Sequence, residues 1–329
     1  MNHAGENTRP SEVMYTPRTP QMRERQRFNL STKPVDEVIS VSGMEDLVGK
    51  TWNIYAVSVL FGLQQDDIHF KLYSKRLREE IASTLSHEDV TYDAKFSMME
   101  DIVDIFPNHE NYPAIKIEVL ATINDHEKKK SLYQGILLSW GITQPELNVK
   151  NLIRLPLLLC SGTSTCIDAV HATINRMFDC LIIALPAKEH DLSWLIPIII
   201  MTNKEEPAVS GEVKMVYTIP ELPVTDTITV KFQSADLRKI LLAIITNQKD
   251  DNIFLDRNHI EIFFEVLHKQ MLILGGLELG LCTLHRIDLP GITIMENRMK
   301  IVNVEIMNNV LLYLNEKAFD IFHTVHIDT

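Results

Sequence analysis

The sequence has few cysteines and lacks long apolar runs, and both shortages limit what the protein can be. Only four cysteines occur among 329 residues, and no two of them form a CxxC pair. Apolar stretches such as LIPIIIM (195–201) fall far short of the roughly 18 residues that cross a bilayer. No signal peptide opens the chain, so we expect a reducing intracellular compartment, no disulfides and no membrane span.

Positive charge is also scarce. The chain carries 32 Lys and Arg against 44 Asp and Glu, a formal net charge of −12. An acidic chain is poorly suited to bind nucleic acid by itself, because duplex affinity comes mostly from neutralising phosphates. Residues 1–34 are the exception, with six Lys and Arg against three Glu. This segment therefore carries +3, and the remainder of the chain carries −15.

The segment 1–45 has the composition of a disordered basic tail, rich in Pro, Ser, Thr and charge with little apolar periodicity. Thr16 and Thr19 each precede a proline, which makes each a minimal site for a proline-directed kinase. A phosphate there adds up to about two negative charges beside neighbouring arginines. Such Thr-Pro pairs are also common in disordered tails without being modified.

The rest of the chain predicts an α+β fold with largely antiparallel sheets and packed helices, because most strands alternate and many connections are short. A helix is predicted at 66–85, where Phe70, Tyr73, Leu77 and Ile81 share one face. A buried strand is predicted at CLIIAL (180–185), followed by a helix capped by Asp191. We divide the folded chain into parts at 46–205 and 206–329. Further predictions are strands at 114–123, 213–219, 227–233, 292–295 and 299–304, and helices at 234–246, 256–272 and 305–320.

One stretch, FDCLIIALPAKEHDLSW (178–194), has the residue types of a thiol active site. Asp179, Cys180, His190 and Asp191 lie within a dozen residues. A thiol nucleophile needs a nearby base and an electropositive, partly exposed setting. Cys180 instead opens an apolar run, so we favour a buried and unreactive cysteine.

Other candidate sites are incomplete. SGTST (161–165) lies between a strand and a helix but lacks the second Gly and the Lys of a phosphate loop. GGLELG (275–280) follows a helix pattern and resembles a helix terminator. Cys160 and Cys166 are not spaced as a zinc knuckle, and His323 with His326 forms at most a weak chelate. We therefore expect no metal, no cofactor and no small-molecule substrate.

Two features favour macromolecular contacts. Lys71, Lys75 and Arg78 line one flank of the helix at 66–85, where they can contact DNA phosphates or remain simply solvated. The hairpin 291–304 has a second strand that is apolar on both faces, which indicates either an interior strand or an edge that pairs with a partner chain. We assign the partner interface to this hairpin, at Ile292, Ile294, Met299, Ile301, Val302 and Val304.

The order of several stretches resembles the centromere protein L family of the inner kinetochore. These stretches are GKTWNIYAVSVLFGL with LYSKRLREEIA, then RLPLLLCSGTSTCIDAVHATINRMFDCLIIAL, HDLSW and MKIVNVEIMNNVLLYLNEKAFDIF. The resemblance spans about 47–322, while 100–112 and 203–226 are divergent.

The resemblance implies a nuclear, non-enzymatic scaffold subunit at the centromere. It implies a heterodimer with centromere protein N through sheet elements near the C-terminus, inside a network that includes centromere protein C. Contact with centromeric chromatin would be made mostly by the partner. The competing hypotheses are an autonomous nucleic-acid-binding protein that uses the basic helix flank and the tail, and a thiol or phosphoryl enzyme.

Overall fold

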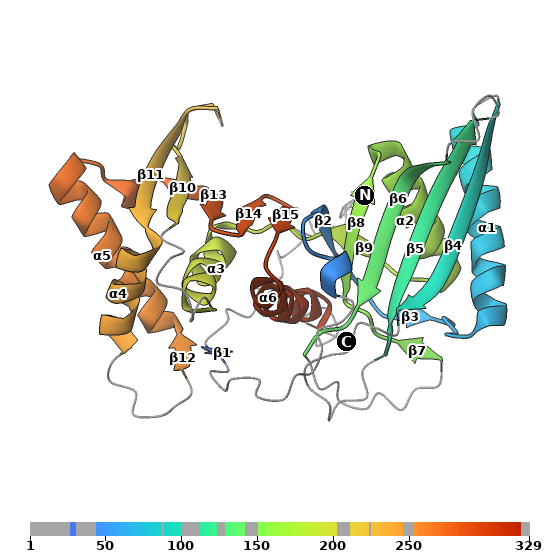
Figure 1. Ribbon diagram of the computed structural model, residues 1–329, viewed down its shortest axis with the longest axis horizontal. Helices are drawn as coiled ribbons and strands as arrows, with labels where there is room; N and C mark the ends of the chain where they lie inside the picture. Colours follow the sequence, from blue (N-terminus) through green and yellow to red (C-terminus); the bar gives the residue numbers. More distant parts are fainter. Residues whose placement is uncertain are drawn as a thin grey trace, which may run out of the picture.

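One long antiparallel sheet crosses the molecule, and helices cover different faces of it at its two ends (Figure 1). The structure is a computed structural model. It describes residues 27–30, 44–86, 89–99, 112–123, 129–141, 151–202, 211–223, 225–245 and 253–323.

The sheet has eleven strands among the described residues, and every pairing is antiparallel. This confirms the predicted α+β class. Ten strands form a continuous order, and β9 (Ile182–Ala184) pairs with β2 beside that path. The order is β11 (Thr227–Gln233), β10 (Glu212–Thr218), β13 (Thr283–Leu289), β14 (Ile292–Met295), β15 (Arg298–Ile301), β2 (Thr51–Val57), β8 (Leu157–Gly162), β6 (Lys129–Leu138), β5 (Ala114–Ile123) and β4 (Val90–Met99).

Two short antiparallel pairs lie outside the large sheet. One joins β3 (Leu60–Phe61) to β7 (Leu152–Ile153). The other joins β1 (Arg27–Leu30) to β12 (Ile253–Asp256), which directly precedes a helix. Strand β1 falls inside the segment predicted to be disordered, so that prediction is wrong for residues 27–30. Thr16 and Thr19 lie outside the described residues.

The helices are α1 (Asp67–Leu85), α2 (Ser164–Phe178), α3 (Glu189–Thr202), α4 (Ser234–Ile245), α5 (Arg257–Gly275) and α6 (Val304–His323). Helices α1 and α2 pack on one face of the strands β8, β6, β5 and β4. Helices α3, α4, α5 and α6 pack on the opposite face, towards β2, β15, β13 and β10. Neighbouring residues of β8 point to opposite faces of the sheet. Leu158 packs in the core with α1 and α2, and Leu159 packs in the core with α3 to α6.

Helix α1 confirms the sequence prediction closely. Its buried residues are Phe70, Tyr73, Leu77 and Ile81, the four that share one face. The carboxylate of Asp66 accepts hydrogen bonds from the backbone N–H groups of Ile68 and His69, which would otherwise lack partners. Helix α5 likewise begins at its predicted start, where Asp256 caps it in a reciprocal arrangement with His259.

The predicted boundary at 205/206 does not separate two sheets. Strand β15 of the C-terminal part pairs with β2 of the N-terminal part, with Met299 opposite Trp52. Helix α3 of the N-terminal part packs against β13, α4 and α5. The boundary itself lies outside the described residues, and the two parts remain a prediction about folding units.

Candidate interaction surfaces

The four residues of the thiol hypothesis have separate structural roles. Asp179 ends α2 in a left-handed conformation with φ 43°. His190 stacks edge-on against Trp194, with ring centroids 6.4 Å apart. Cys180 is half-buried, and its Sγ lies 3.7 Å from Asn175 Oδ1. Burial, and then the charge of Asp179, raise the pKa of this thiol to about 12, so it remains protonated at neutral pH.

Three details of that stretch were predicted wrongly. Cys180 is partly rather than fully buried, because the strand after it, β9, is short and lies beside the main path of the sheet. Leu181 is 52% exposed, so CLIIAL is not a buried strand. Asp191 is the third residue of α3 rather than its cap, and its carboxylate reaches back to the backbone N–H of Lys188 at 2.8 Å.

Asp191 instead holds α3 against α6. It is 5% exposed and accepts hydrogen bonds from Tyr313 Oη at 2.9 Å and Lys317 Nζ at 2.6 Å. Lys317 Nζ also donates to the carbonyl oxygen of Pro186. Burial lowers the pKa of Lys317, and the Asp191 carboxylate partly offsets that shift. This buried ion pair is a structural element, since the ammonium nitrogen and both carboxylate oxygens have hydrogen-bond partners within the fold.

The remaining small motifs are structural as well. Thr163 of SGTST occupies the cap position of α2 without a side-chain hydrogen bond to the helix. Gly276 ends α5 with φ 66°, which confirms GGLELG as a helix terminator. Within the described ranges, no group of three or more His, Cys, Asp or Glu residues is placed to hold a metal ion. The described helices include none that is long and apolar enough to cross a membrane.

The hairpin β14–β15 is an interior part of the sheet. Strand β15 is hydrogen-bonded to β14 on one side and to β2 on the other. Four of the predicted interface residues are at most 3% exposed within this chain's own core: Ile292, Ile294, Met299 and Ile301. Their side chains are therefore already buried and cannot form an interface without opening the core.

The second strand of the hairpin is also shorter than predicted. It ends at Ile301, and Val304 is the first residue of α6. Val302 lies between them and is 57% exposed. The strand that was expected to be apolar on both faces is therefore apolar on one face, and the start of a helix follows it. Of the six predicted interface residues, Val302 is the one with a largely exposed side chain.

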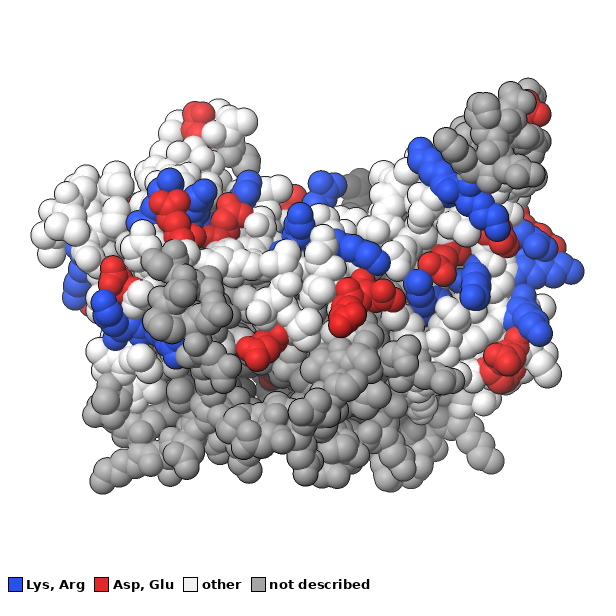
Figure 2. Space-filling view, in the orientation of Figure 1, with Lys and Arg blue, Asp and Glu red and all other residues white. Residues whose placement is uncertain are grey.

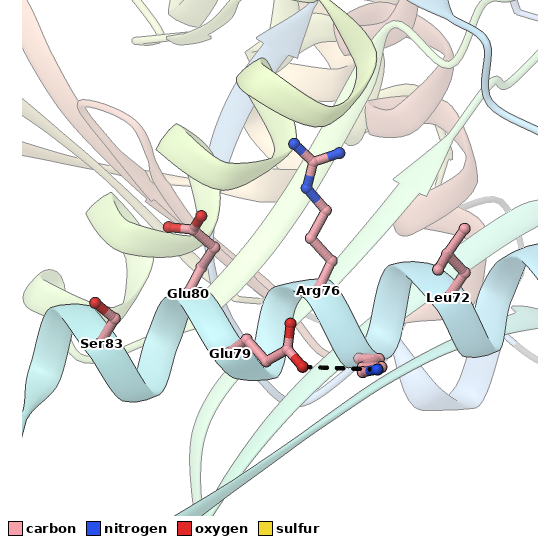
Figure 3. A pocket seen from close by; sticks show the side chains of 6 residues that line it. Leu72, Arg76, Glu79, Glu80 and Ser83 are labelled. Atoms are coloured by element: carbon pink, nitrogen blue, oxygen red, sulfur yellow. Dashed lines mark ion pairs between the residues drawn. The ribbon is translucent and has the colours of Figure 1, made fainter.

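The flank of α1 that was predicted to contact DNA carries both signs of charge. Lys71, Lys75 and Arg78 are all exposed. Lys75 forms an ion pair with Glu79 at 3.9 Å, drawn as the dashed line in Figure 3. On the same helix, Glu80 pairs with Arg176 of α2 at 2.9 Å. Neighbouring carboxylates thus offset part of the positive charge, and DNA contact through this flank remains a prediction.

A more basic surface lies on the sheet itself. The outer face of β10, β11, β13, β14 and β15 has no helix over it among the described residues. Cross-strand register aligns Lys231 with Lys214, Lys214 with Asp288, and Thr293 with Lys300. Figure 2 shows Lys and Arg side chains along these strands, with carboxylates among them at the β10 end. The cations of this face are Lys214, Lys231, Arg286, Arg298 and Lys300, and its acids are Glu212 and Asp288.

Part of this basic face is unpaired. Glu212 pairs with Lys231 at 3.1 Å and lies 3.8 Å from Lys214 Nζ, and Asp288 pairs with Arg286. Arg298 and Lys300 are exposed, and neither has an ion pair within the part of the chain that the structure describes. The face as a whole carries +3, although the whole chain carries −12.

An apolar surface marks the C-terminal end of α5, which we call the α5 tip. It consists of Leu272, Ile273, Leu274 and Leu281, which are 48%, 81%, 74% and 67% exposed. Three consecutive residues of a helix span about 200°, so one chain cannot bury them all against a single face. The tip lies at the end of the molecule that also carries β11, an edge strand paired only with β10 among the described residues (Figure 1).

The basic outer face and the α5 tip are exposed surfaces of the two kinds that commonly contact other macromolecules. Residues 46–319 match the family model of centromere protein L. A comparison with curated proteins finds no match. The matched range covers most of the 329 residues, so the chain belongs to the centromere protein L family. Membership implies a structural component of the kinetochore, placed at the centromere in the nucleus and acting in chromosome segregation within a complex.

Proposed function

We propose that this chain is a scaffold subunit that pairs with centromere protein N and helps anchor the kinetochore on centromeric chromatin. The observation that carries the pairing is the α5 tip. Four exposed apolar side chains gathered at one helix end mark a protein interface, whereas single exposed apolar residues such as Leu181 are common on protein surfaces. The adjacent edge strand β11 offers backbone hydrogen bonds to a strand of the partner. These hydrogen bonds would fix the orientation of the partner on this chain.

The α5 tip replaces the hairpin β14–β15 as the proposed partner surface. It still belongs to the C-terminal part of the chain, as the family resemblance implies. Other inner-kinetochore subunits, including centromere protein C, would contact the heterodimer rather than this chain alone.

Coexpression with centromere protein N of the same organism tests the pairing. We expect the two chains to elute together in gel filtration at a one-to-one ratio. Purified alone, this chain should self-associate or be poorly soluble, because the α5 tip then has no partner. Separate elution of the two chains after coexpression would contradict the proposal.

Direct contact with DNA is a second candidate function, favoured by the basic outer face of the sheet. No carboxylate of the described residues pairs with Arg298 or Lys300, and no described helix covers the face over its five strands, which are spaced about 4.8 Å apart. Such a face suits contacts with successive phosphates, which bind without reading the base sequence. Because the whole chain is acidic, we expect this contact to supplement DNA binding by the partner and not to replace it.

We expect Arg298→Gln with Lys300→Gln to weaken duplex binding by the heterodimer. Each lost phosphate contact should lower the slope of log affinity against log salt by about 1, so the pair lowers it by about 2. Fluorescence anisotropy across a salt series measures this slope. Lys71→Gln with Arg78→Gln on α1 is the matched control and should leave the slope unchanged. The reverse result would assign the contact to α1.

A further inference from the structure

A pocket of 340 Å³ lies between α3 and α5. Trp194 and Tyr217 are almost fully buried and form part of its wall. Phe264 and His268 line it from α5, with ring centroids 5.9 Å apart. The pocket is therefore lined with aromatic rings on several sides.

The charged groups of this pocket are mostly acidic. Glu189 and Glu261 face one cation, Arg257, which already pairs with Glu261 at 2.7 Å. One oxygen of Glu189 accepts a hydrogen bond from the backbone N–H of Leu284 at 3.2 Å. No Lys or Arg pairs with Glu189 in the described ranges. Burial lowers the pKa of His268, so this ring does not supply the missing positive charge at neutral pH.

A carboxylate beside aromatic rings fits a guanidinium group. Arginine stacks its planar face on rings and donates paired hydrogen bonds to a carboxylate. A lysine ammonium satisfies the charge but not the planar stacking. The chemistry of the pocket thus indicates an arginine side chain on an extended segment.

Strand β1 brings the chain to the mouth of this pocket. Strand β1 pairs with β12, which places Arg27 opposite Asp256, and the next residue, Arg257, lines the pocket. Strand β1 also contacts α3, the other wall. The segment that precedes β1 contains Arg23 and Arg25 in the sequence QMRERQR, and it joins the strand at Arg27, the residue opposite Asp256.

The segment before β1 is long enough to reach Glu189 along α5. Tyr217 contacts His268, and the charge of Glu189 acts on both rings, so Glu189 lies towards the His268 end of the pocket. The helix from Arg257 to His268 is about 16 Å long. Four extended residues from Arg27 back to Arg23 span up to about 13 Å, and the arginine side chain covers the remainder.

We propose that the basic segment before β1 docks along α5 and places Arg23 in this pocket against Glu189. Tethering raises the effective concentration of Arg23 to the millimolar range, so a weak surface ion pair is enough to hold it. Thr19 lies four residues before Arg23. A phosphate on Thr19 would compete with Glu189 for the guanidinium and release the segment. The proposal does not depend on pairing with centromere protein N.

Trypsin cleavage of the full-length protein tests the docking. The rate of cleavage after Arg23 and Arg25 is followed by mass spectrometry in the unaltered protein and in Glu189→Gln. We expect Glu189→Gln to speed both cleavages by about fivefold, because loss of one ion pair raises the undocked fraction by that factor. Cleavage after Arg18 should remain unchanged and serves as the internal reference.

Glu265→Gln is the matched control. Glu265 also lies on α5 in an ion pair, with Lys269 at 2.6 Å, and it does not line the pocket. This variant should leave all three cleavage rates unchanged. Equal rates after Arg23 and Arg25 in the unaltered protein and in Glu189→Gln would overturn the proposal. The pocket would then be open to a cationic side chain from another protein.

Discussion

Ile301→Asp should unfold the protein, whereas Val302→Asp should leave it folded. Ile301 is 0% exposed and lies at the end of a strand that is paired on both sides. An aspartate there places an unpaired carboxylate in the core, at a cost of several kcal/mol. Val302, one residue later, is 57% exposed, and its replacement should change the stability by less than about 0.5 kcal/mol.

Circular dichroism and thermal melting distinguish the two variants. We expect Ile301→Asp to aggregate or to lose its cooperative melting transition. Val302→Asp should melt as the unaltered protein does. A folded Ile301→Asp variant that has lost only partner binding would contradict the interior position of β15 and would restore the hairpin as the interface.

Asp191→Ala should destabilise the protein by roughly 3–5 kcal/mol, because it leaves the ammonium group of Lys317 buried without its counter-charge. The side chains of Lys317 and Asp191 are 9% and 8% exposed, so water cannot replace the lost partner. Tyr313 and the first turn of α3 lose a hydrogen-bond acceptor in the same variant. Urea denaturation of the purified protein measures the change.

Two further variants isolate the buried pair. Glu265→Ala removes one member of an exposed pair with the same 2.6 Å separation, and it should leave the denaturation midpoint unchanged. Asp191→Leu combined with Lys317→Met removes both charges and should recover a large part of the lost stability. If Asp191→Ala alone has no effect, water or another group solvates Lys317 and the assignment fails.

Much of the local structure could be predicted because helices repeat their apolar residues on one face. The predicted starts of two helices were correct, and Asp66 and Asp256 cap them. The start of α6 was predicted one residue late, at 305, and Asn303 caps the helix by accepting a hydrogen bond from the backbone N–H of Ile306. The sequence IVNVEI places that asparagine three residues before an apolar residue, which is a helix-start signal. This signal argued against a continuous strand through Val304.

Pairing between distant strands could not be predicted, because the alternation of a strand does not identify its neighbour. Nothing in Met299–Ile301 indicates that Trp52 lies opposite Met299. Strand β1 could not be predicted for the same reason, because its four residues form a strand only by pairing with β12. The basic outer face depends on this register as well, since its cations come from four separate strands.

The α5 tip was missed for a different reason. The predicted helix ended at residue 272, inside MLIL (271–274), and these apolar residues were given no role. The three exposed members of MLIL follow one another directly, whereas a core-facing stripe repeats every three or four residues. That departure was the available signal for an interface.

The most direct test of the proposed partner surface is coelution of centromere protein N with an altered α5 tip. Ile273→Asp with Leu274→Asp places two charges on residues that are 81% and 74% exposed, so the chain should still fold. Ile68→Asp on α1 is the control, since Ile68 is 78% exposed at the opposite end of the sheet. We predict that the tip variant elutes without centromere protein N and that Ile68→Asp retains it. A tip variant that elutes with centromere protein N at the unaltered ratio would contradict the account.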